Sequence, residues 1–284
     1  MTIETVQAID VHAHYGRYHR HEFPALINGF MSADASVVLQ RAKRANTQHT
    51  IVSPYRSLLP RGEADVCAGN DEAAQVVRAT PGLLQWVVVQ PLQPQTYEQA
   101  EQMLQHPTCV GIKIHPEEHV YPIAEHGRAL FQFAAQHQTL VLAHSGQPNS
   151  LPHDFMPFAN EFPEMSLILA HLGNGPEALA PDITPDASLQ VRAIQTARHD
   201  NVYVDTSSAR SIQPGLIEWA VTEVGVDRVL YGTDTPTYFA GMQRTRIDQA
   251  ELPDADKRRI LRDGPAALLK RHGTDIGELP GPDR

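Results

Sequence analysis

Histidine and aspartate side chains stand at the ends of several short apolar runs in this chain. DVHAH carries His12 and His14, LAHSG carries His144, LAHLG carries His171, and YGTD carries Asp234. Imidazoles and carboxylates are the donors that Zn(II) and other first-row divalent ions accept in proteins. Burying these groups separately would be expensive, whereas one cation can satisfy several together. The residue types therefore predict a divalent metal centre.

No single motif among these is decisive. With 15 histidines in 284 residues, roughly one His-x-His arises by chance. His19 and His21 form a second such pair in the polar stretch YGRYHRHEF, which we interpret as surface. A lone buried histidine is also more often a hydrogen-bonded core residue than a ligand. A metal centre therefore requires that several of these residues share one place in the fold.

The order of elements along the chain predicts such a place. Eight short runs rich in Val, Ile and Leu alternate with amphipathic stretches, as buried parallel strands alternate with helices. This order predicts an α/β fold, a (β/α)8 TIM barrel. A doubly wound open sheet is the alternative, but HAHYG stands where its Gly-rich phosphate turn would follow the first strand. The expected strands are QAIDVHAH, HTIVSPY, LLQWVVVQP, CVGIKIHP, LVLAHSG, LILAHLG, VYVDTSS and RVLYGTD.

In a barrel, the carboxyl ends of the strands meet at the active site. The polar residues at those ends are Asp10, His12, His14, Lys113, His115, His144, His171, Asp205 and Asp234. Because side chains alternate along a strand, Asp10, His12 and His14 should share one face. We expect that face to line the barrel mouth, with Ile9, Val11 and Ala13 packing against the helices.

Length and composition agree with one enzyme-sized barrel. No linker divides the chain, so we expect a single domain over residues 1–272 and a loose tail over 273–284. The net charge of −10 argues against nucleic acid or an anionic membrane as partner. Two widely separated cysteines, a start that carries acidic residues rather than Lys or Arg, and the lack of a long apolar run favour a cytoplasmic protein. A small-molecule substrate is expected, and a homodimer is left open.

The pieces DVHAH, GIKIHP, LAHSG, LAHLG and YGTD, in this order, resemble the amidohydrolase superfamily. The resemblance is to its amidohydrolase-2 branch of metal-dependent TIM-barrel hydrolases and decarboxylases. It implies His12, His14 and His144 as ligands of one ion, with Asp234 touching the ion or its water. It also implies Zn(II) or Mn(II) as that ion. His171 would polarise the substrate or donate a proton.

Lys113 is open between two roles. Some relatives with two metals bridge them through a carboxylated lysine on strand four, where Lys113 stands. The GIKIHP form is more similar to the one-metal branch, so we expect an unmodified Lys113 that holds substrate or neighbouring carboxylates.

The expected reaction is hydrolysis of a C–O or C–N bond in a lactone, ester or amide through a metal-activated water, with Asp234 accepting its proton. The alternative is non-oxidative decarboxylation of an aromatic or muconate-like acid, and a metal-binding protein without catalysis is the third class. Arginine forks suit carboxylates, which favours a small anionic substrate, although such arginines are also common surface charges. The expected substrate-binding residues are His115, Arg17, Arg56, Arg61 and Arg210.

Overall fold

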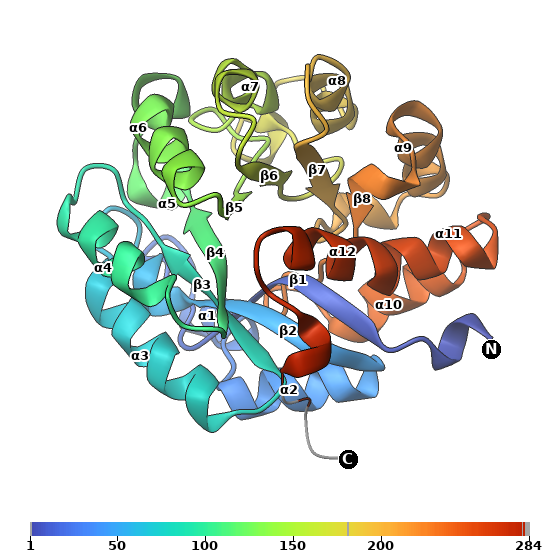
Figure 1. Cartoon of the computed structure of the whole chain (residues 1–284), viewed down its shortest axis with the longest axis horizontal. Coiled ribbons are helices and arrows are strands. Elements are labelled where there is room, and N and C mark those ends of the chain that lie inside the picture. Colours follow the sequence, from blue (N-terminus) through green and yellow to red (C-terminus); the bar gives the residue numbers. More distant parts are fainter. Residues whose placement is uncertain (1, 181, 280, 282–284) are drawn as a thin grey trace.

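The structure, a computed structural model, describes residues 2–180, 182–279 and 281. Eight parallel strands follow one another around a single sheet in chain order, with helices outside them (Figure 1). The predicted (β/α)8 barrel is therefore confirmed. The strands are β1 Ala8–Tyr15, β2 Thr47–Pro54, β3 Leu83–Val88, β4 Cys109–Ile114, β5 Leu140–Ala143, β6 Ser166–Leu169, β7 Val202–Asp205 and β8 Val229–Leu230.

The barrel closes where the last strand meets the first. The Val11 amide donates to the carbonyl of Tyr231 at 3.0 Å, and the His14 amide donates to that of Thr235 at 2.7 Å. Thr235 lies beyond the end of β8, so the chain continues alongside β1 after the regular strand stops. This closure brings residues from the two ends of the sequence side by side.

Most helices lie where the amphipathic stretches predict them, and three others occur in loops for which no helix was expected. These three are α1, α5 and α10, which follow β1, β4 and β8. The stretch from Asp254 to Arg271 is helical but includes a π-helical turn at Arg259–Asp263. The helices are α1 Ala25–Phe30, α2 Ala35–Arg44, α3 Val66–Ala79, α4 Gln95–Met103, α5 Pro116–His119, α6 Ile123–Gln136, α7 Pro152–Glu161, α8 Leu189–Gln195, α9 Leu216–Val224, α10 Ala240–Asp248, α11 Asp254–Arg258 and α12 Gly264–Arg271.

Strand β1 departs from the expected alternation. Ile9 and Val11 do not pack on the helices but belong to the apolar cluster inside the barrel, which includes Trp86 and residues from all eight strands. The register against β2 shifts between Asp10 and Ala13, as a β-bulge does. Beyond the shift, Ala13 packs outside, whereas His12 and His14 line the cavity at the barrel mouth. The expectation for Ile9 and Val11 was therefore wrong, because the bulge reverses the facing of the strand.

Asp10 is likewise not at the barrel mouth. Its carboxylate accepts hydrogen bonds from the Thr233 hydroxyl at 2.6 Å and the Thr233 amide at 3.0 Å. It also accepts from the His12 amide at 3.1 Å. Asp10 therefore ties β1 to the segment after β8 and has no place in the expected polar face.

The C-terminal segment (red) from α12 onward lies across one end of the barrel (Figure 1). Leu268 and Leu269 of α12 belong to the interior cluster, and so does Ile276, which is buried. This part of the expected tail therefore packs onto the barrel. Within the described residues, no helix combines the length and the apolar character needed to cross a membrane.

Candidate active site

Three donor atoms meet at the carboxyl ends of β1 and β8. The Nε2 atoms of His12 and His14 are 3.2 Å apart. An Asp234 carboxylate oxygen is 3.1 Å from the Nε2 of His14 and 3.8 Å from that of His12. All three residues are buried. The structure thus brings together His12 and Asp234, as the barrel requires, although they lie 222 positions apart in the sequence.

The partners of the two rings show which nitrogens are free to bind a cation. The Nδ1 of His14 is 3.0 Å from the Ser53 carbonyl, which can only accept, so Nδ1 carries the hydrogen. The Nδ1 of His12 is 2.8 Å from a carboxylate oxygen of Asp205 and carries its hydrogen for the same reason. In the neutral rings, both Nε2 atoms therefore present lone pairs toward each other and toward Asp234. Three acceptors facing one another fit a divalent cation.

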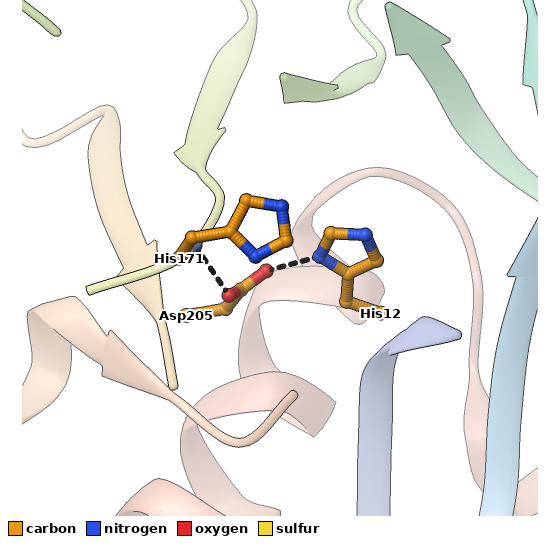
Figure 2. Close-up of side chains that lie close together, drawn as sticks. All are labelled: His12, His171 and Asp205. Carbon is orange, nitrogen blue, oxygen red and sulfur yellow. Dashed lines mark hydrogen bonds and ion pairs between the residues drawn. The ribbon is translucent and has the colours of Figure 1, made fainter. Parts of the chain in front are cut away.

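Asp205 has the geometry of an orienting group (Figure 2). One of its oxygens accepts from the His12 ring, and the other accepts from the His171 amide at 2.9 Å and the Ser207 amide at 3.0 Å. A carboxylate that holds the far nitrogen of a ligand histidine fixes both its tautomer and its ring. Sequence analysis placed Asp205 at a strand end but gave it no role.

His144 and His171 form a chain of hydrogen bonds beside the donor atoms. The Nε2 of His171 is 3.0 Å from the Nδ1 of His144, whose Nε2 is 2.8 Å from the side-chain oxygen of Gln147. The Ser207 hydroxyl is 2.8 Å from the Nδ1 of His171. Both nitrogens of His144 are thus engaged, and this ring lies outside the group formed by His12, His14 and Asp234. Its role as a ligand stays a prediction.

The backbone is strained at two of these residues. His171 has a φ of 73° and Asp234 has a φ of 53°, in the left-handed region of backbone conformation that residues other than glycine seldom adopt. The His171 amide is held by Asp205 and the Asp234 amide by the His12 carbonyl at 2.7 Å. Strain that the surroundings enforce in this way is typical of functional sites.

Lys113 and His115 occupy the end of β4 as the sequence predicts. The Lys113 Nζ lies 3.1 Å from the Nε2 of His12, and the side chain is fully buried. Burial lowers the pKa of Lys113 to about 8, against the opposing effect of the Asp205 and Asp234 charges. His115 stacks on the ring of His144 with 4.1 Å between centroids, and both rings line the cavity.

Burial sets the protonation of this site. It lowers the pKa of His12 and His171 well below the usual value and that of His144 to about 3, with the Lys113 charge acting in the same direction. These rings are therefore neutral at physiological pH, as metal ligands must be. Burial raises the pKa of Asp234.

The donor atoms open into a cavity of about 260 Å³. Its walls include the aromatic side chains of Tyr18, Phe23 and Tyr55 and the guanidinium of Arg20. Tyr55 stacks on the ring of His14 at 5.0 Å and donates to or accepts from the Thr237 hydroxyl at 2.6 Å. The cavity is thus small and largely aromatic, and three charged side chains line it, those of Arg20, Glu118 and Asp234.

The four arginines expected to bind substrate do not line this cavity. Arg17 lies in a neighbouring hollow with His19 and His21, and this hollow shares Tyr18, Arg20 and Phe23 with the cavity. Arg56 is exposed and pairs with Glu72 at 3.3 Å. Arg61 pairs with Glu118 at 3.3 Å, and Arg210 pairs with Glu177 at 2.7 Å.

Among the described residues, Arg20 is the one arginine in the cavity wall. Sequence analysis missed it because the tract YGRYHRHEF was interpreted as surface. Its alternation of aromatic and basic residues was the available signal.

A family model described as amidohydrolase matches residues 9–271. The chain belongs to the amidohydrolase family. No curated protein sequence is significantly similar to it.

Several solved structures share the fold. The 2,6-dihydroxybenzoate decarboxylase from Rhizobium is 14% identical with a TM-score of 0.72, over 96% of this chain and 100% of that one. A dihydroxybenzoic acid decarboxylase from Polaromonas, with bound manganese and 2-nitroresorcinol, is 14% identical with a TM-score of 0.67, over 95% and 97%. The 5-carboxyvanillate decarboxylase from Sphingomonas paucimobilis is 12% identical with a TM-score of 0.66, over 93% and 99%. At these identities, the likeness shows the barrel fold.

Proposed function

We propose that this protein is a metal-dependent decarboxylase that removes a carboxylate from a small aromatic acid without an oxidant. The observation that carries the proposal is the set of three acceptor atoms, from His12, His14 and Asp234, at a cavity with aromatic walls. The similarity of fold to three aromatic acid decarboxylases supports this reaction over the hydrolysis that the sequence alone favoured.

The reaction exchanges a carboxylate for a proton. The bond between the ring carbon and the carboxylate breaks, its electron pair stays on the ring, and a proton joins the same carbon as carbon dioxide leaves. When bound, a divalent ion at the donor atoms supplies positive charge that holds an anionic oxygen of the substrate. Asp234 is suited to hold and deliver the proton, because burial raises its pKa whereas burial lowers the pKa of His12 and of His171.

We propose one Zn(II) or Mn(II) ion per chain. Two imidazoles and a carboxylate suit either ion. Manganese is the ion bound in the Polaromonas decarboxylase. We propose that Lys113, whose Nζ lies 3.1 Å from the Nε2 of His12, stays unmodified beside this single ion.

Hydrolysis of a C–O or C–N bond is the second candidate, and the description of the matched family model favours it. Asp234 would then accept a proton from the attacking water and pass it to the leaving group. His171 would stabilise the charge that develops on the substrate oxygen.

One assay separates the candidates. Protein loaded with zinc or manganese is incubated in D2O with 2,6-dihydroxybenzoate and 5-carboxyvanillate, and in parallel with lactones, aryl esters and anilides. A decarboxylase releases carbon dioxide and leaves one deuterium on the vacated ring carbon. Cleavage of the esters, lactones or anilides without carbon dioxide would replace the proposal with hydrolysis. Full metal occupancy with no turnover on any substrate would favour a metal-binding protein without catalysis.

A further inference from the structure

Arg20 is held in the cavity wall by its own backbone and by two rings. The side-chain amide of Asn28 accepts from the Arg20 amide at 3.1 Å and donates to the Arg20 carbonyl at 3.0 Å. The guanidinium carbon lies 5.8 Å from the centroid of the Tyr18 ring and 5.7 Å from that of Phe23. Both contacts are within the range of a cation–π interaction. The position of this cation is therefore built into the loop between β1 and α1.

The guanidinium of Arg20 has donors that its neighbours do not use. One terminal nitrogen bonds to the carboxylate of Glu118. The Nε is buried, and no hydrogen-bond partner for it occurs among the described residues. Only 16% of this side chain is exposed. A buried N–H without a partner costs free energy that an acceptor in the cavity would recover.

Glu118 pairs with Arg61 as well as with Arg20, so it does not depend on Arg20 alone for a counter-charge. Its side chain is 3% exposed, so leaving its charge unpaired would be expensive. The Nε and Nη2 of Arg61 lie 3.3 and 3.4 Å from its two oxygens. Arg61 lies outside the cavity wall, so it would keep Glu118 paired if Arg20 bonded to an anion in the cavity. The three charges sum to +1, which suits one negative group.

We propose that Arg20 binds a second, non-reacting anionic group of the substrate, and that Arg61 makes this possible by keeping Glu118 paired. The anion at Arg20 is not the carboxylate that leaves, because an ion pair with that group would be lost as neutral carbon dioxide forms. Such a contact would stabilise the substrate more than the transition state, and so would slow the reaction. An ion pair with an anionic group remote from the reacting carbon is kept throughout the reaction. This inference names the substrate class of the proposed function, an aromatic ring with two acidic groups.

The test compares two probes that differ in one charge. Isophthalate carries two carboxylates, and 3-carbamoylbenzoate has a neutral amide in place of the second. Calorimetric titration of the manganese-loaded protein should show at least about tenfold tighter binding of isophthalate, the usual size of a charged hydrogen bond. Arg20→Met should abolish this preference. Arg56→Met, which removes an exposed arginine outside the cavity, should keep it.

A second variant tests the part of Arg61. In Arg61→Met, Glu118 retains Arg20 as its remaining cation, so the preference for isophthalate should fall several-fold while 3-carbamoylbenzoate binds as before. An unchanged preference in Arg20→Met would overturn the anion site. An unchanged preference in Arg61→Met would overturn the claim that Arg61 keeps Glu118 paired while Arg20 binds the anion. Binding is measured without turnover. An Arg20-dependent preference without carbon dioxide release in the assay above would therefore contradict the decarboxylase and leave the anion site standing.

Discussion

His12 and His14 each offer the Nε2 atom to a metal ion, because the Nδ1 hydrogen of each ring is bonded to Asp205 or to the Ser53 carbonyl. His12→Ala with His14→Ala should reduce bound metal from about one ion per chain to background, since two of the three donors disappear. His19→Ala with His21→Ala is the matched control, because it removes a pair with the same spacing from a different hollow. Elemental analysis of both variants after reconstitution checks this. Equal metal content in the two would contradict the site.

His171 should affect turnover without affecting metal content. It lies against His144 and Ser207, and it groups with His12 and Asp205 rather than with His14 and Asp234. His171→Asn should therefore retain the ion while turnover falls about 10²-fold, the usual scale for a lost acid–base or electrostatic group. Parallel metal and activity measurements test this, with the exposed His106→Asn as the control. Metal loss in step with activity would instead make His171 a ligand.

The site residues that sequence could predict are those that strand ends position. His12 and His14 lie near the carboxyl end of β1 and Asp234 follows β8, so the barrel alone brings them together. Arg20 could not be predicted, because its place depends on the path of a loop and on contacts with Tyr18 and Glu118. The engagement of His144 by Gln147 depends in the same way on a turn after β5, which motif spacing does not specify.

Strands and long helices were predictable because burial imposes a pattern on them. Eight apolar runs gave all eight strands, and the closing of β8 on β1 followed from the barrel. The bulge in β1 was not predictable, because it arises from pairing with β2 on one side and with the segment after β8 on the other. Helices α1 and α5 were missed because they are short and lie in loops, where local contacts decide the conformation. Helix α10 was missed because its sequence, AGMQRTRID, lacks the apolar spacing of an amphipathic helix.

Helix α10 fastens the N-terminal segment to the barrel through one buried arginine. The guanidinium of Arg244 donates to the carbonyls of Ile3, Val6 and Ala45 and pairs with Asp248 at 2.8 Å. Arg244→Met should therefore lower the free energy of unfolding by about 3 kcal/mol, because it strands buried acceptors and a carboxylate. Urea unfolding measures this.

Arg192→Met, which removes an exposed arginine from α8, is the control for Arg244→Met and should stay within about 0.5 kcal/mol of the wild type. A similar small change for Arg244→Met would show that this contact does not hold the segment.

The response of the whole molecule to acid follows from histidines that it buries in the neutral form. Burial lowers the pKa of both His49 and His119 to about 4, helped for His49 by the charge of Arg262. Above pH 6.5 these rings are neutral in the folded and the unfolded chain and have no effect. As pH falls from 6.5 to 4, the unfolded chain takes up protons that the folded one does not, so stability is lost over that window. Asp10, whose pKa burial raises to about 7, acts in the opposite direction.

His49 isolates this effect because its ring is fully buried and neither nitrogen has a partner among the described residues. His49→Leu removes the titrating group and leaves Asp10 and His119 unchanged. The variant should therefore gain stability relative to the wild type as pH falls, by about 2 kcal/mol between pH 7.5 and pH 5, since each pKa unit corresponds to about 1.4 kcal/mol. Urea unfolding of both proteins at the two pH values measures the difference. A difference that stays constant with pH would mean that the folded protein protonates His49 as readily as the unfolded chain does.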